Sequence, residues 1–64
     1  MDFKTRKWII TNNTANKTFE VTRIEPIEEE SSLDTIWEMV SNLFFLGSNV
    51  TITNENGEAR TYIK

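Results

Sequence analysis

Hydrophobic and polar residues alternate on both sides of an asparagine-rich run near the start of the chain. The segment reads KWIITNNTANKTFEVTRI. Asparagine tolerates turn geometry, so residues 13–16 are predicted to form the loop of a β-hairpin. A loop at this position sets Trp8 opposite Val21 and Ile10 opposite Phe19. All four side chains then share the face of the hairpin that enters the core.

The middle of the chain has the apolar spacing of an amphipathic helix. The apolar residues that recur every three or four positions are Leu33, Ile36, Trp37, Val40, Leu43 and Phe44. Just upstream, SSLD has the form of a capping box, with Ser31 as the N-cap and Asp34 three residues later. Gly47 supplies a stop at the other end. The pattern therefore predicts a helix over residues 32–46.

The last segment, NVTITNENGEARTYIK, predicts a second hairpin. Asn56-Gly57 between two alternating runs is the strongest short-range sign of a hairpin turn. A two-residue turn there sets Val50 opposite Ile63 and Ile52 opposite Thr61 on the core face. The residues then expected on the opposite, outer face are Thr51, Thr53, Arg60 and Tyr62.

The order strand, strand, helix, strand, strand predicts an α+β fold. A four-stranded, mainly antiparallel sheet would carry one helix on one face, which makes a two-layer ββαββ domain. All 64 residues are expected to form one small domain, with hairpins at about 3–25 and 48–63 around the helix at about 32–46. The predicted core comprises Trp8, Ile10, Phe19, Val21, Leu33, Ile36, Trp37, Val40, Leu43, Phe44, Val50, Ile52 and Ile63.

Composition removes several classes of function. The chain has no cysteine and no histidine, which excludes disulfides and the usual zinc sites. Its serines have no histidine to activate them, and two glycines do not build a phosphate loop. We therefore expect no catalytic activity, no cofactor and no metal. The start, MDFKTRKWII, lacks the apolar core of a signal peptide, so a cytoplasmic protein without membrane contact is expected.

Charge is unevenly distributed along the chain. Residues 1–24 carry five basic and two acidic side chains, a net of +3, whereas residues 25–64 carry two basic and eight acidic ones, a net of −6. The acids that gather around the predicted helix start are Glu25, Glu28, Glu29, Glu30, Asp34 and Glu38. A negative helix start suits the helix dipole. The alternatives are that basic residues of the first hairpin neutralise this row, or that it imitates a run of phosphates.

The final hairpin, VTITNENGEARTYIK, resembles the closing hairpin of phage uracil-DNA glycosylase inhibitors. The similarity covers 15 of the 64 residues. Those inhibitors are acidic proteins that mimic DNA, and a Glu-Ser pair at a strand edge enters the cleft of the enzyme. Glu30-Ser31 is the pair in this chain that compares with it. The resemblance implies an acidic DNA mimic that inhibits a nucleic-acid enzyme.

The first hypothesis for function is a small protein-interaction domain, adaptor-like or inhibitor-like, of bacterial or phage origin. Phe45 falls on the polar side of the predicted helix, and Met39 and Leu46 border its apolar stripe, so these three side chains are candidates for a partner or homodimer contact. The further candidates for partner binding are Glu28, Glu29, Glu30, Asp34 and Glu38. The alternative is nucleic-acid binding by the basic first hairpin and the outer sheet face, through Lys7, Arg60 and Tyr62.

Overall fold

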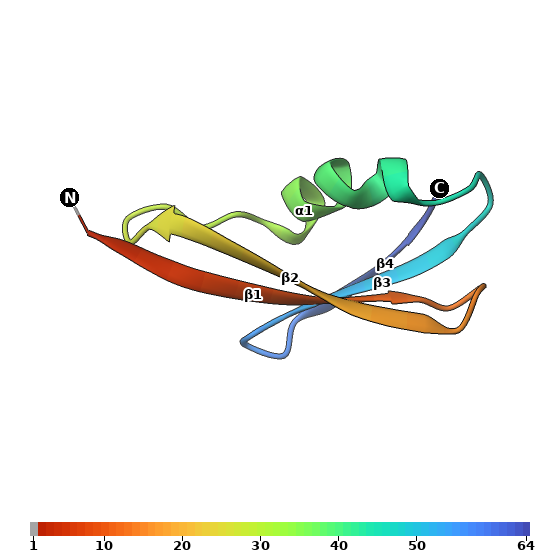
Figure 1. The fold of residues 1–64 in the computed structure, drawn as a ribbon, viewed down its shortest axis with the longest axis horizontal. Coiled ribbons are helices and arrows are strands. Elements are labelled where there is room, and N and C mark those ends of the chain that lie inside the picture. The colour runs from red at the N-terminus through yellow and green to blue at the C-terminus, as the bar shows by residue number, and fades with distance from the viewer. Residues whose placement is uncertain (1) are drawn as a thin grey trace.

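The strands and the helix follow one another in the predicted order ββαββ. The computed structural model describes residues 2–64. Its elements are β1 (Phe3–Asn12), β2 (Lys17–Pro26), α1 (Leu33–Val40), the short 3₁₀ helix η1 (Ser41–Leu43), β3 (Asn49–Asn54) and β4 (Ala59–Ile63). The strands form one antiparallel sheet in the order β2-β1-β3-β4. Because α1 covers one face of this sheet, the predicted two-layer α+β fold is confirmed (Figure 1).

The first hairpin has the predicted turn and register. Trp8 pairs with Val21 and Ile10 pairs with Phe19. The turn occupies residues 13–16, as predicted. The side chain of Asn12 accepts hydrogen bonds from two backbone N–H groups of the turn, both at 3.1 Å. The asparagine-rich run thus supplies the side-chain acceptor that holds the turn together.

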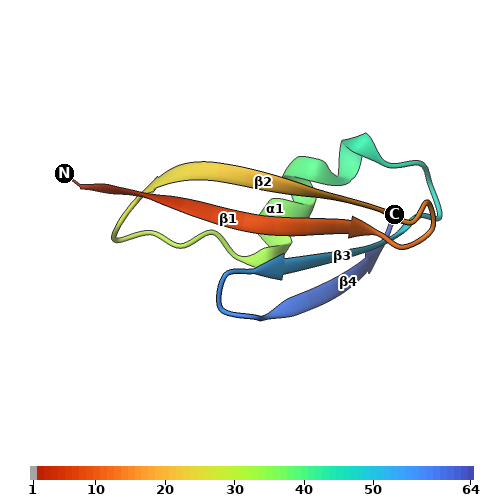
Figure 2. The same cartoon turned by 60° about the horizontal axis from the view of Figure 1, so that its bottom comes forward.

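The first hairpin is longer than the rest of the sheet. β1 pairs with β2 through all ten of its residues, whereas β3 pairs with β1 only from Trp8 to Asn12. The free half of the hairpin projects beyond α1 and the second hairpin (Figure 2). The molecule is therefore elongated, with extents of 40 × 19 × 15 Å.

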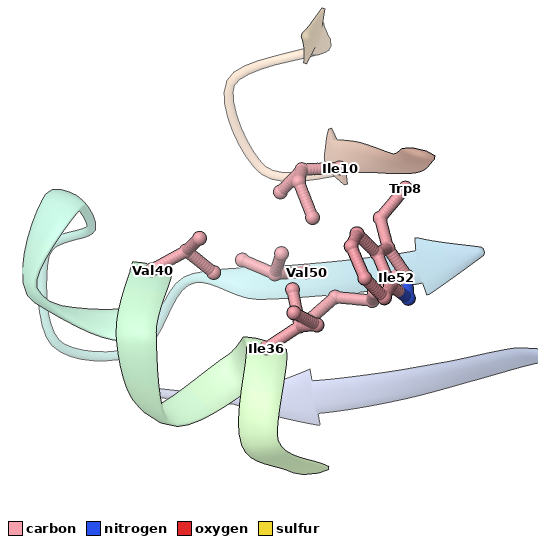
Figure 3. Close-up of a cluster of buried hydrophobic side chains, with 6 residues drawn as sticks. All are labelled: Trp8, Ile10, Ile36, Val40, Val50 and Ile52. Carbon is pink, nitrogen blue, oxygen red and sulfur yellow. The ribbon is translucent and has the colours of Figure 1, made fainter. Parts of the chain in front are cut away.

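The core lies between α1 and the centre of the sheet. Its buried side chains are Trp8, Ile10, Ile36, Val40, Val50 and Ile52 (Figure 3). The partly buried residues packed around them are Val21, Leu33, Trp37, Phe44 and Tyr62. The prediction was wrong for Leu43 and Ile63, which are 69% and 65% exposed, and Phe19 lies at the margin with 37% exposed.

The helix is shorter than predicted and begins one residue later. Ser32 is its N-cap, because the Ser32 hydroxyl oxygen accepts a hydrogen bond from the Thr35 backbone N–H at 3.1 Å. The prediction of Ser31 as the N-cap was wrong. The α-helix ends at Val40 and η1 adds one tighter turn, so the predicted end at residue 46 was also wrong.

Phe44 marks the end of the helical stretch. Its backbone is extended, and its ring stacks at 6.1 Å on Trp37 and at 6.2 Å on Phe19. Lys64 Nζ donates to the Ser41 carbonyl at 2.8 Å, which satisfies one of the carbonyls that a helix end leaves free.

The second hairpin is shifted by one residue from the predicted register. Val50 pairs with Tyr62 and Ile52 pairs with Arg60, not with Ile63 and Thr61. The turn contains three residues: the Asn54 N–H donates to the Glu58 carbonyl at 2.9 Å, and Gly57 has φ +88°. This geometry is a type I turn followed by a left-handed glycine.

The register shift exchanges the two faces of β4, because side chains alternate along a strand. Arg60 and Tyr62 share the face of Val50 and Ile52, under the helix. Thr61 and Ile63 belong to the outer face. The predicted placement of Arg60 and Tyr62 on the outer face was therefore wrong.

Candidate functional site

A group of apolar side chains remains uncovered where the helix leads into β3. Met39, Leu43, Phe45 and Leu46 are 49%, 69%, 90% and 87% exposed, and we call these four residues the helix-exit patch. The position of the last two is fixed by a tight turn. The Ser48 N–H donates to the Phe45 carbonyl at 3.1 Å, and Gly47 has φ +88°. Phe45 and Leu46 thus lie together at the tip of a turn that favours glycine.

An apolar cavity adjoins the patch. Its volume is about 290 Å³, and its lining residues are Asn12, Ala15, Lys17, Phe19, Leu43, Phe44 and Phe45. Lys17 is the only charged residue in this lining. The inner wall is fixed by ring stacking, since Phe44 lies between Phe19 and Trp37. An aromatic wall and a nearly uncharged lining suit an apolar side chain of a partner.

The sequence identified part of this surface. Met39, Phe45 and Leu46 were the apolar candidates for partner binding, and they lie at the end of α1 and in the following turn. Leu43 and Phe19 were assigned to the core, but they line the cavity instead. The helical spacing of apolar residues does not show that the helix ends early. Because it does end early, Leu43 turns outward.

The acidic row is divided between the interior and the surface. Glu25 is 4% exposed, accepts hydrogen bonds from Ser31 and from Arg23, and lies 3.9 Å from Arg6. The Ser31 hydrogen bond lowers the pKa of the Glu25 carboxyl, and the two arginines lower it further, against the raising effect of burial. Ser31 therefore holds a buried carboxylate instead of capping the helix.

Two more acids of the row are engaged within the fold. Glu30 lies 3.7 Å from Lys4 and 3.8 Å from Arg6. Asp34 accepts hydrogen bonds from Arg60 at 2.9 Å and from Tyr62 at 2.6 Å. The remaining members, Glu28, Glu29 and Glu38, are exposed and form no ion pair within residues 2–64. Basic residues of the first hairpin thus neutralise part of the row, and a continuous run of six free carboxylates does not exist.

The residues considered for nucleic-acid binding are separated. Tyr62 stacks on Trp37 with ring centroids 4.9 Å apart, so one face of its ring is already covered. Arg60 donates to Asp34. Lys7 stays exposed on the outer face, where Ile9 and a series of threonines surround it. The sheet thus does not bring these three side chains to one surface.

A pH titration of the Tyr62 phenol would test its placement under the helix. Burial, followed by the hydrogen bond to Asp34, raises the pKa of Tyr62 from 10.0 to about 12. The neutral phenol is thus favoured in the fold, and its stabilising effect is complete below pH 10 and lost as the pH rises through about 12. Because Tyr62 is the only tyrosine, ultraviolet absorbance of the phenolate reports it alone.

We expect this titration to have its midpoint near 12 in the native protein and near 10 in denaturant. Asp34→Asn should lower the native midpoint without returning it to 10, because burial remains. A native midpoint near 10 in the unmodified protein would contradict the inward placement of Tyr62.

A second cavity lies at the start of α1. Its volume is about 290 Å³, and its charged lining comprises Arg6, Arg60, Glu30, Asp34 and Glu58. The carboxylates outnumber the guanidinium groups, and both arginines already face carboxylates. This balance disfavours an anionic ligand. Within residues 2–64, no three acidic side chains meet in a way that would hold a metal ion.

No helix among residues 2–64 is long and apolar enough to cross a membrane.

No family model, curated protein or solved structure matches this chain. Fold and surface together define a small α+β protein with one helix on a four-stranded sheet and an uncovered apolar patch where that helix ends.

Proposed function

We propose that this protein is a non-catalytic protein-binding module, and that the helix-exit patch is its contact surface. The observation that carries the proposal is the pair Phe45 and Leu46, 90% and 87% exposed beside an apolar cavity of about 290 Å³. Burying a side chain of this size is worth about 1.5–3 kcal/mol. In the single chain, Phe45 and Leu46 do not gain this free energy, because both stay exposed. Two neighbouring exposed side chains of this kind indicate a surface that a partner covers.

The chemistry of the surface also indicates the type of contact. Aromatic residues that fill a dehydrated pocket supply most of the binding energy in protein interfaces. The cavity offers Phe19 and Phe44 as walls, and the turn offers Phe45 as a projecting ring. We therefore expect a partner that contributes an aromatic or leucine side chain. A cytoplasmic adaptor or inhibitor of bacterial or phage origin remains part of this proposal.

The test is a selection of displayed random peptides on the wild-type protein, with counter-selection on Phe45→Glu. We expect the enriched peptides to carry an aromatic or leucine residue. Their affinity for Phe45→Glu should fall at least about 30-fold, because loss of an interface hot spot costs about 2 kcal/mol or more. Fluorescence anisotropy of labelled peptides would measure both affinities.

Ile24→Glu is the matched control. Ile24 is 73% exposed, lies five residues from Phe19 along β2 and belongs to the outer face of the sheet. The same change of chemistry there should leave peptide affinity unaltered. If every selected peptide bound the wild type and Phe45→Glu equally well, the patch would not be the contact surface and the proposal would fail.

A further inference from the structure

We infer that the partner is a second copy of this chain. Two protomers associate about a two-fold axis, and Phe45 of each enters the apolar cavity of the other. The inference rests on the proposed function and names the partner for the same surface. It is carried by the shape, area and charge of the patch.

The shape of the patch is self-complementary. A two-fold interface uses the same surface of both copies, so this surface must contain a projection and a matching hollow. Phe45 is the projection, and it also forms the edge of the cavity that Phe19 and Leu43 line. An apolar cavity of about 150 Å³ already admits a benzene ring. The cavity here is about 290 Å³, which accommodates the phenyl ring of a partner.

Phe45 does not fill its own cavity. Its side chain is 90% exposed although it borders the hollow. The hydrogen bond between Ser48 and Phe45, together with the positive φ of Gly47, fixes the turn that carries it. The hollow therefore remains accessible to another ring, and the projecting ring remains available to another hollow.

The area of the patch suits a weak dimer. The exposed parts of its apolar residues and of Phe19 amount to on the order of 600 Å², taking about 200 Å² for a fully exposed large side chain. A stable interface of standard size buries about 800 Å² on each partner. A dimer through this patch therefore belongs to the lower end of the range, with an expected dissociation constant of about 1–100 µM.

The charges near the patch permit contact between identical surfaces. A surface with charges of one sign would face its own repulsion across a two-fold axis. Here Lys17 lines the cavity, and Glu38 precedes Met39 on α1, and both are exposed. These two charges differ in sign, so the neighbourhood of the patch does not carry charge of a single sign.

The single chain is small and less compact than is usual for its length. Its radius of gyration is 12.2 Å. A compact chain of this length has a radius of gyration of about 10.7 Å. A core of this size contributes only about 3–5 kcal/mol, and association is one way in which small domains gain stability. The outer sheet face is a poorer second candidate, because Lys7, Glu20 and many threonine hydroxyls interrupt it.

Sedimentation equilibrium of the full chain tests the inference. We expect the wild type to be a reversible monomer–dimer mixture over about 1–300 µM, and Phe45→Glu to weaken association at least about 30-fold. Ile24→Glu should associate as the wild type does. Circular dichroism melts should coincide for all three proteins when they are monomeric, because both replaced side chains are largely exposed.

Nuclear Overhauser spectra on a mixture of isotope-labelled and unlabelled protein supply the second measurement. We expect contacts between the Phe45 ring of one copy and Phe19 or Leu43 of the other. A wild type that remains a monomer at about 300 µM overturns the inference. A dimer that Ile24→Glu dissociates while Phe45→Glu does not also overturns it, because the copies then meet through the outer sheet face.

The peptide selection distinguishes a failure of the dimer inference from a failure of the proposed protein-binding function. It uses nanomolar protein, at which a dimer of micromolar affinity is dissociated. A monomeric wild type whose selected peptides still require Phe45 overturns the dimer and leaves the protein-binding function standing. A monomeric wild type without such peptides overturns both.

Discussion

Replacing Ile52 with alanine is expected to unfold most of the protein at room temperature. Ile52 is fully buried at the centre of β3, where it packs with Trp8 and Ile36 in the core cluster. Truncating a buried isoleucine to alanine costs about 2–5 kcal/mol. A core in a chain this short supplies about 3–5 kcal/mol in total. Urea unfolding followed by far-ultraviolet circular dichroism would measure the loss.

Ile63→Ala is the matched control for this experiment. Simple alternation through a two-residue turn assigns Ile63 to the core, whereas the observed register leaves it 65% exposed on the outer face. Its replacement should cost less than about 1 kcal/mol, which is mainly the lower strand propensity of alanine. Equal losses at the two positions would contradict the three-residue turn.

Replacing Arg6 with methionine is expected to have the second large effect. The Arg6 side chain is 9% exposed, and its guanidinium lies 3.9 Å from Glu25, 3.8 Å from Glu30 and 3.5 Å from Glu55. It also lies 5.3 Å from the centre of the Trp8 ring. Its removal leaves the buried Glu25 with one cation fewer. Breaking a buried ion pair from one side costs about 3–5 kcal/mol.

Arg60→Met is the control, because it removes the same charge from an exposed pair. Arg60 and Asp34 are 58% and 61% exposed in their side chains. An exposed ion pair contributes about 0–1 kcal/mol. Urea midpoints of both variants would give the comparison. If Arg6→Met were as mild as Arg60→Met, the interior cluster around Glu25 would not stabilise the fold.

The strand pairing of the first hairpin could be predicted, and that of the second could not. In the first hairpin, the asparagine-rich run fixes the number of loop residues and alternation does the rest. In the second, Asn56-Gly57 identifies a turn without fixing its length. Asn54 decides the length, because its side-chain oxygen accepts from the backbone N–H groups of Asn56 and Glu58 at 3.0 and 2.9 Å. Two-residue and three-residue turns differ by one position in register.

The N-cap was predicted wrongly, and the burial of Arg6 was not predicted, for different reasons. Two adjacent serines each satisfy the pattern of a cap, and only the position of Glu25 decides that Ser31 turns toward it. Arg6 is in phase with Trp8 and Ile10 along β1, so alternation already points it inward. A charged side chain is seldom buried without partners. The three nearby carboxylates that make the burial of Arg6 possible come from other segments of the chain, so alternation along β1 does not reveal them.

The apolar patch was partly predictable. A helical wheel separates Phe45 from the apolar stripe, which marks it as uncovered. The cavity depends on Phe19 of β2 meeting Leu43 and Phe44 at the end of the helix. These residues lie far apart in the sequence, and only the tertiary fold brings them together.

The turn between β3 and β4 also limits how this sequence can diverge. Surface loops commonly gain or lose residues with little effect. Here a single insertion or deletion between Asn54 and Glu58 would exchange the two faces of β4. Tyr62 would then be exposed and Ile63 buried. The hydrogen bonds from Arg60 and Tyr62 to Asp34 would be lost in the same step. The length of this exposed loop should therefore be held as strictly as the identity of a core residue.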